Sequence, residues 1–283
     1  MVLLASNSFV NLIAAQKAAV RAAQAAGKLM LTNWHVQKRV NFSDAHDIKL
    51  ALDVRCQKLI EKTLRAAFPQ IPLLGEEGDS GNMDAEYRWV VDPIDGTVNY
   101  ARGIPHAAVS IALQARSDEK NPRGRTQDRA TRHAPHVTLV GVIYGPFTDE
   151  LWTVTHDGPT RLNGRIVRVS RRAKPGEAIV AMGFSKSKTN LEKSLPHLNR
   201  LARRVLKVRL MGSAALELAY VASGRLDLYV ERTINLWDIA AGALMVERSG
   251  GEFYTQPAAG GKLRMVADNG LLRRKLQLGS LLK

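Results

Sequence analysis

The chain has 283 residues, enough for one large domain or two small ones with a substantial buried core. It carries 41 Lys and Arg against 26 Asp and Glu, a formal net charge of +15, and its only cysteine, Cys56, excludes an internal disulfide. We expect Cys56 to be a buried thiol rather than a nucleophile. Because no apolar run reaches about 18 residues, we expect no membrane-spanning segment and a cytoplasmic protein.

Two helices are predicted first. Residues 6–35 have the pattern of an amphipathic helix rather than a signal peptide, with Ser6 or Ser8 as its N-cap and Gly27 near its end. Residues 50–68 have the apolar spacing of a second helix, which Pro69 follows. Its buried face is predicted from six residues: Leu52, Cys56, Leu59, Ile60, Thr63 and Leu64.

A run of mostly antiparallel strands is predicted next. Short β-rich segments lie between turn signals, and the Asn-Gly pair of LNGR is typical of a hairpin. The polar segment 114–136 has no periodicity and is predicted to be an exposed insertion. The predicted strands are IPLLG (71–75), RWVVD (88–92), HAAVSIAL (106–113), VTLVGVIYGP (137–146), ELWTVT (150–155) and IVRVS (166–170).

From residue 179 the pattern changes to alternating strands and helices. GSAALELAYVASG (212–224) and WDIAAGALMVERSGG (237–251) have helical spacing, and RLDLYVE (225–231) between them is a predicted strand. The chain is therefore predicted to have an α+β half followed by an α/β half.

Five carboxylates stand at the ends of these predicted elements. Asp92 ends a strand and Asp95 follows in the turn; Glu76 and Glu77 end another strand, and Asp238 opens a helix. Taken singly, D-P-x-D-G is typical of a tight turn, Glu-Glu of a solvated loop, and Asp238 of a helix N-cap. Because Mg²⁺ prefers oxygen ligands, the combination predicts a magnesium site instead.

Three segments carry a resemblance. LLGEEGD (73–79), WVVDPIDGTVNY (89–100) and LWDIAAGALMVERSGG (236–251) resemble the signature segments of the inositol monophosphatase family, magnesium-dependent phosphatases that include fructose and nucleotide bisphosphatases. The resemblance extends over nearly the whole chain. It implies a layered αβαβα sandwich, a single catalytic unit with sublobes 1–155 and 156–283, and a homodimer.

The resemblance also implies roles for particular residues. Glu76 and Thr97 would orient the attacking water. Asp53 would support a metal ion or its water shell, and Glu77 is a further supporting candidate. The implied metal ligands are Glu76, Asp92, Asp95, Asp238 and the carbonyl oxygen of Ile94, of which Asp92 is also catalytic. The implied substrate-binding residues are Gly96, Thr97, Gly212, Ser213, Ala214 and Glu231, the last at the position that contacts the sugar alcohol's hydroxyls.

One stretch departs from the family pattern. The family usually carries D-x-V-T-x-x-D, whereas residues 47–53 are D-I-K-L-A-L-D, with Lys49 and Leu50 in place of Val-Thr. Phe42 stands where a lysine is usual, although Lys38 and Arg39 are close in sequence. We expect the loop that helps to hold a third metal ion to be altered and turnover to be weak.

The function predicted from these features is hydrolysis of inositol monophosphate by water, with two or three Mg²⁺ ions and no covalent intermediate. Histidinol phosphate, fructose 1,6-bisphosphate and 3'-phosphoadenosine 5'-phosphate remain alternative substrates.

The alternative from another class is a low-activity relative that binds RNA or the transcription machinery. Residues 171–210 contain eleven Lys or Arg against two Glu, typical either of a polyanion-binding surface or of a solvated face. Arginines of the 114–136 insertion would add to such binding.

Overall fold

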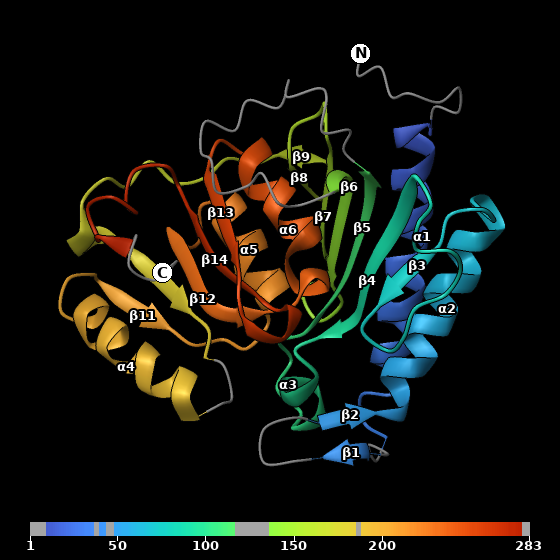
Figure 1. Ribbon diagram of the computed structural model, residues 1–283, viewed down its shortest axis with the longest axis horizontal. Helices are drawn as coiled ribbons and strands as arrows, with labels where there is room; N and C mark the ends of the chain where they lie inside the picture. Colours follow the sequence, from blue (N-terminus) through green and yellow to red (C-terminus); the bar gives the residue numbers. More distant parts are fainter. Residues whose placement is uncertain (1–9, 37–39, 44–47, 117–135, 185–187, 279–283) are drawn as a thin grey trace.

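The elements of the chain stack in five layers. The structure, a computed structural model, describes residues 10–36, 40–43, 48–116, 136–184 and 188–278. Helices and sheets alternate, helix–sheet–helix–sheet–helix, from right to left in Figure 1. The predicted fold class, a layered α+β sandwich, is confirmed.

Two helices, α1 (Leu12–Thr32) and α2 (Ala51–Ala67), form the outer layer against a seven-stranded sheet. All neighbouring strands of this sheet are antiparallel except β3 and β4. A separate small pair, β1 (Val40–Ser43) and β2 (Ile48–Leu50), lies beside the short helix α3 (Thr97–Ala101). In sheet order the seven strands are β3 (Leu73–Gly75), β4 (Tyr87–Asp95), β5 (Ala108–Arg116), β6 (His136–Gly145), β7 (Glu150–Thr155), β8 (Arg161–Leu162) and β9 (Arg165–Ile166).

The second sheet has five strands and is mixed. Strands β10, β11 and β12 are parallel, as expected of strand and helix alternation, whereas β13 and β14 form an antiparallel hairpin that the sequence did not reveal. Helices α5 (Ala214–Ala222) and α6 (Leu236–Arg248) lie between the two sheets, and α4 (Lys188–Ala202) covers the far side. In sheet order the strands are β11 (Lys207–Arg209), β10 (Ile179–Met182), β12 (Leu228–Ile234), β14 (Leu263–Asp268) and β13 (Glu252–Pro257).

Helix α1 differs from its prediction at both ends. It begins at Leu12, because the side chain of Asn11 accepts a hydrogen bond from the Ala14 amide at 3.0 Å and caps the helix. The predicted caps, Ser6 and Ser8, lie outside the described residues. Gly27 lies inside the helix rather than near its end, where a Cβ would come 2.5 Å from the ring of Tyr144 on β6. The buried side of the helix, which faces α2 and the sheet, consists mainly of small residues: Ala15, Ala18, Ala19, Ala22, Ala23 and Ala26.

Helix α2 confirms the prediction for residues 50–68. Leu52, Cys56, Ile60 and Leu64 are buried, whereas Leu59 and Thr63 are half-buried. Burial raises the pKa of the Cys56 thiol to about 12, so this cysteine is the inert core residue that was expected.

The predicted insertion 114–136 needs correction at both ends. Strand β5 continues to Arg116 and β6 begins at His136, so the predicted insertion 114–136 includes strand residues at both ends. The side chain of Gln114 bridges to neighbouring strands, accepting from Arg88 and donating to Thr138 at 3.2 Å, so its polarity does not end the strand. Residues 117–135 lie outside the described part of the chain.

The predicted strand 166–170 is also wrong beyond Ile166. Asn163 and Gly164 close a hairpin, as predicted, and both have positive φ; after this hairpin the chain leaves the sheet. The cause lies at Asp227, a fully buried carboxylate that accepts hydrogen bonds from Ser170 and Arg172 and so fixes this segment to the second sheet. The division into sublobes at residue 155 stays a prediction, although the first sheet continues to Ile166.

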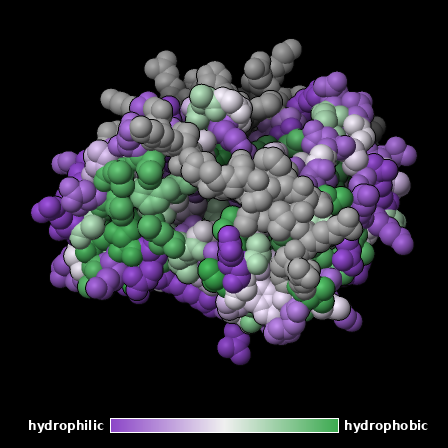
Figure 2. Space-filling view, turned by 90° about the horizontal axis from the view of Figure 1, so that it is seen from below, coloured by the Kyte–Doolittle hydropathy of each residue, from purple (hydrophilic) through white to green (hydrophobic). Residues whose placement is uncertain are grey.

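The surface over α4 is partly apolar. Exposed leucines at positions 191 and 195 lie on α4, and Leu206 and Leu210 flank β11. Figure 2 shows an apolar patch on this side of the molecule, bordered by hydrophilic residues.

Among the described helices, none has the length and apolar character needed to cross a membrane. The predicted homodimer stays a prediction.

Candidate metal centre

The strand β4 ends in an irregularity that aims two carboxylates. Asp92 pairs with Ser110 and Asp95 with Ala108, so the ladder shifts between them as in a β-bulge. Asp92 Oδ1 accepts a hydrogen bond from the Ile94 amide at 3.0 Å. Asp95 was expected in a turn after the strand, but β4 runs through to Asp95. The bulge, rather than a turn, therefore turns both side chains toward one place.

Helix α5 holds the carboxylate of Asp95. Asp95 Oδ1 accepts from the Ala214 amide at 3.2 Å, and Oδ2 accepts from the Ala215 amide at 2.8 Å and from the Ser213 hydroxyl. These donors stand at the N-terminus of α5, where the helix dipole also favours negative charge. Asp95 is thereby fixed between the first sheet and the middle helix layer.

Helix α6 supplies the third carboxylate. Asp238 Oδ2 accepts from the backbone amide of Asn235 at 2.9 Å and from its side-chain amide at 3.2 Å. Asn235 is the N-cap and Asp238 the third helical residue, so the two form a capping box. Lys262 donates to Asn235 Oδ1 and keeps this cap in place.

The three aspartates form a cluster in which one carboxylate oxygen of each lies within 4.8 Å of one oxygen of each of the others. Asp92 is 2% and Asp95 is 7% exposed. Burial raises the pKa of Asp92 well above its usual value, and the charges of Glu76, Asp95 and Asp238 raise it further. Burial likewise raises the pKa of Asp95 to about 6, although its hydrogen bonds from α5 act in the opposite direction. The pKa of Asp238 is raised well above its usual value by burial and then by Asp95.

This donor set suits a hard cation. The charges that bear most strongly on Asp92 are all negative, and a buried group of like charges is stabilised when a metal ion binds between them. The oxygen atoms of carboxylates are ligands that Mg²⁺ prefers. The cluster can therefore hold a metal ion.

Glu76 follows β3 directly and joins the cluster through Asp92. Its backbone amide donates to the Val91 carbonyl at 3.2 Å, and its carboxyl group shares a hydrogen bond with Asp92. Glu77 lies in the next turn, whose backbone is held by Gln57 of α2: Gln57 Oε1 accepts from the Glu77 amide at 2.9 Å. Sequence reasoning missed Gln57, although a polar residue on the buried face of α2 was a signal that could have found it.

Asp53 has a structural contact at the start of α2. Its carboxylate accepts from the amide of Leu50, the N-cap residue, at 2.7 Å, and the side chain is 2% exposed. The departing positions Phe42 and Lys49 face each other across the β1–β2 ladder, and β2 lies beside α3. Lys38 and Arg39 lie outside the described residues.

The turn at Gly96 packs closely against neighbouring backbone. Gly96 has φ of 90°, and a Cβ there would lie 2.9 Å from the His106 carbonyl and 3.2 Å from that of Gly212. Thr97 Oγ1 donates to the Ile94 carbonyl at 2.8 Å. Asn99, which sequence reasoning missed, donates to the Met211 carbonyl at 2.8 Å. The predicted substrate-binding turns at 96–97 and 212–214 are thus brought side by side.

Glu231 lies on β12, beside two residues that sequence reasoning also missed. Tyr229 donates to Glu231 Oε2, and Glu217 of α5 lies next to both. The charge of Glu231 acts on Asp238, which places it close to the acidic cluster. Glu217 could have been found as an acidic residue within the otherwise apolar helix AALELAYVA.

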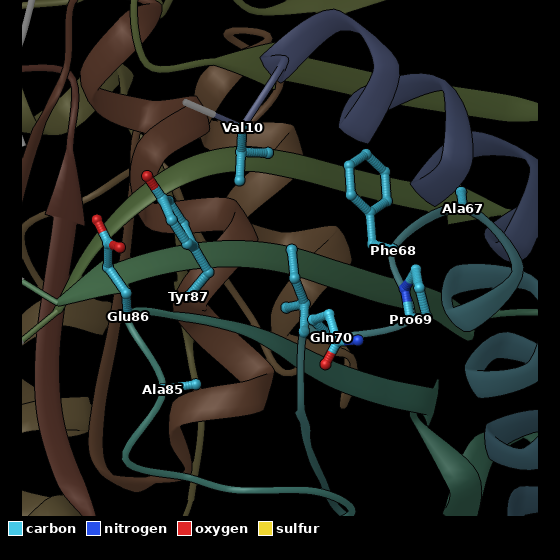
Figure 3. Close-up of a pocket in the computed structure, with 9 residues that line it drawn as sticks. Val10, Ala67, Phe68, Pro69, Gln70, Ala85, Glu86 and Tyr87 are labelled. Atoms are coloured by element: carbon cyan, nitrogen blue, oxygen red, sulfur yellow. The ribbon is translucent and has the colours of Figure 1, made fainter. Parts of the chain in front are cut away.

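The hollow drawn in Figure 3 lies at the other end of β4. It has a volume of about 340 Å³, and Phe68, at the end of α2, and Tyr87, the first residue of β4, contribute rings to it. Asp92 and Asp95 stand at the opposite end of the same strand. The chemistry of the acidic cluster is therefore separate from this hollow.

Comparison with known proteins decides the family. A model of the inositol monophosphatase family matches residues 13–122 and 134–277. The chain belongs to the inositol monophosphatase family. It is 36% identical over 248 residues to the inositol-1-monophosphatase of Rhizobium meliloti, a match covering 86% of this chain and 85% of that protein. It is 35% identical over 237 residues to the Nus factor SuhB of Escherichia coli, covering 82% of each.

A solved structure agrees with this membership of the inositol monophosphatase family. The extragenic suppressor protein suhB of Bartonella henselae superimposes with a TM-score of 0.81 at 32% identity, over 94% of this chain and 97% of that one. The family and its relatives support a phosphatase. The predicted metal ligands and substrate contacts remain predictions about this chain.

Proposed function

We propose that the chain is a Mg²⁺-dependent phosphomonoesterase that hydrolyses inositol monophosphate to inositol and phosphate. The observation that supports this most is the acidic cluster of Asp92, Asp95 and Asp238 with Glu76 beside it, whose mutual repulsion a bound cation would offset. We assign the metal ions, two or three in number, to these four carboxylates and the Ile94 carbonyl.

Magnesium bound there would supply positive charge to the phosphate oxygens and lower the pKa of water. The chain's own residues position the reactants. Thr97 gives its proton to the Ile94 carbonyl, so its oxygen can still accept a hydrogen bond from the attacking water, which it orients together with Glu76. The backbone at Gly96 leaves no room for a side chain and presents the start of α3 to the phosphate.

The choice of substrate rests on Glu231. A carboxylate accepts hydrogen bonds from adjacent hydroxyl groups, so Glu231 beside the acidic cluster favours a polyol phosphate. The test compares initial rates of phosphate release from myo-inositol 1-phosphate, histidinol phosphate, fructose 1,6-bisphosphate and 3'-phosphoadenosine 5'-phosphate. Tenfold faster release from any of the other three would contradict the assignment of inositol monophosphate.

A second candidate function is binding of RNA or of the transcription machinery. The net charge of +15 and the similarity to relatives named Nus factor SuhB favour it. Counterion release predicts that RNA affinity would fall steeply between 50 and 200 mM salt, roughly 10³-fold for about six phosphate contacts. Affinity that does not change with salt would remove the electrostatic basis of this candidate.

A further inference from the structure

The fold brings both ends of the basic segment 171–210 close together. Lys275 Nζ donates to the Ala173 carbonyl at 2.7 Å, and Arg204, which follows α4, donates to the Lys275 carbonyl at 2.8 Å. Three stretches that are far apart in the sequence therefore meet on the side of the molecule where α4 lies, across from α1 (Figure 1). The exposed cations of these stretches are called the basic band: Arg168, Arg171, Arg172, Arg204 and Lys275.

The three arginines of the basic band that precede β10 line a hollow of about 470 Å³. It lies where residues 168–172 pass the C-terminal end of α5, whose Ser223 and Gly224 form its other side. Gly224 has φ of 71°, and a Cβ there would lie 3.1 Å from the Ser170 amide nitrogen, so the two segments are in close contact. The opposite end of α5 donates to Asp95. The hollow is therefore separate from the candidate metal centre.

Two carboxylates near the hollow already have partners. Asp227 is fully buried and accepts from the Ser170 hydroxyl and from Arg172, the latter at 2.8 Å, so it fixes the segment that carries the arginines. The exposed Glu177 is paired with Lys174 at 3.3 Å. The segment is therefore anchored before a ligand arrives, which lowers the entropy lost on binding.

The other cations of the basic band have no carboxylate partner. Within the part of the chain that the structure describes, the side chains of Arg168 and Arg171 make no hydrogen bond or ion pair. Arg204 and Lys275 donate to backbone carbonyls, which leave their charges uncompensated. Such a group of like charges attracts a polyanion, and the planar guanidinium group can bind a phosphate through two donors.

We propose that the basic band binds the phosphodiester backbone of a single-stranded nucleic acid, with one phosphate in the hollow and neighbouring phosphates against Lys275 and Arg204. This inference rests on the second candidate function, binding of RNA, and names the surface that carries it. The described residues that line the hollow include no aromatic ring on which a base could stack. Binding is therefore by charge, with little preference for base or sugar.

The test measures the fluorescence anisotropy of labelled oligo(U) of about 20 nucleotides, long enough to cover a single-strand binding site. Arg168→Gln together with Arg171→Gln removes two phosphate contacts and leaves the paired Arg172 in place. In about 100 mM salt we expect binding to be about 10- to 25-fold weaker, and the slope of log K against log salt to be smaller by about 1.4. Lys275→Gln, whose amide can still donate to the Ala173 carbonyl, removes one contact and should weaken binding about fivefold.

A matched control removes the same charge elsewhere. Arg21 and Lys28 are exposed on α1, across the molecule, so Arg21→Gln together with Lys28→Gln should weaken binding less than about twofold. Arg168→Lys together with Arg171→Lys keeps both charges and should keep the salt slope. Oligo(dT) of the same length should bind within about threefold of oligo(U), because the phosphates are the same. The Tm of each variant should equal that of the unsubstituted protein, which shows that the fold is intact.

Several results would overturn the inference. Equal losses in the α1 control and in Arg168→Gln with Arg171→Gln would show that net charge alone matters. Binding of oligo(U) that is unchanged in Arg168→Gln with Arg171→Gln and in Lys275→Gln would overturn this inference and leave RNA binding in place. No binding of oligo(U) by the unsubstituted protein at about 50 mM salt would overturn RNA binding as well. Variants that keep oligo(U) binding but lose binding to phosphatidylserine vesicles would assign the basic band to a membrane surface instead.

Discussion

Replacing Asp92 by asparagine should stabilise the metal-free protein. The amide oxygen of asparagine can still accept from the Ile94 amide, and its NH₂ group can donate to Glu76, so no hydrogen bond is lost. What disappears is one negative charge from a buried cluster of like charges.

The size of the effect follows from the geometry. Two full charges 4.8 Å apart repel by about 3 kcal/mol at an effective dielectric constant of about 20. Burial and then the charge of Glu76 raise the pKa of Asp92, so removing its charge relieves only part of this repulsion, about 1–2 kcal/mol. For a chain of this length that corresponds to a Tm increase of about 2–3 °C.

The assay is thermal unfolding in EDTA and in Mg²⁺. Asp92→Asn should unfold at a higher temperature than the unsubstituted protein in EDTA and should gain less stability from added Mg²⁺. Asp157→Asn, at a carboxylate that is 78% exposed, is the matched control and should change neither value. A lower Tm in EDTA, or an unchanged response to Mg²⁺, would refute the reasoning that the cluster is a cation site.

Three other predictions concern the rest of the molecule. Gly27→Ala should lower the free energy of unfolding, measured by urea denaturation, by about 1–3 kcal/mol, because the new Cβ meets Tyr144. Gly176→Ala is the control and should be nearly neutral, because a Cβ there meets no atom within 4 Å. Equal losses in the two variants would contradict the packing argument. Asp227→Ala should cost about 3–5 kcal/mol in the same measurement, because a buried carboxylate with three partners is lost, and a cost below about 1 kcal/mol would contradict its role. Burial raises the folded-state pKa of Glu217 to about 8. The metal-free protein should therefore lose stability relative to Glu217→Gln as pH rises from about 5 to 8, with a slope near 1.4 kcal/mol per pH unit. A difference in unfolding free energy between the two proteins that does not change with pH would show that Glu217 does not titrate in this range.

The acidic cluster was predictable because its members stand at or near the ends of secondary-structure elements. Asp92 and Asp95 follow an apolar run, Glu76 follows a short strand, and Asp238 opens a helix, and such ends converge at one edge of a layered fold. The β-bulge at Asp92 was not predictable, because the proline of the D-P-I-D segment is equally typical of a turn. The hairpin at Asn163 was predictable from local sequence alone.

Features that depend on long-range packing could not be read from the sequence. Asn11 competes with Ser6 and Ser8 as a cap, and all three residue types suit that position. Gly27 has the pattern of a helix end until Tyr144 is known to lie against it. Glu217 lies on a helix and Glu231 on a strand, so only their positions in the fold reveal that the charge of one acts on the other.

The most direct test of the central claim is phosphate release from myo-inositol 1-phosphate, measured with and without Mg²⁺ beside Asp92→Asn. We predict turnover that requires Mg²⁺ and falls at least about 100-fold in the variant, roughly 2.7 kcal/mol of lost transition-state stabilisation. Turnover that is independent of Mg²⁺, or a variant as active as the unsubstituted protein, would contradict the assignment of the acidic cluster as the catalytic metal centre.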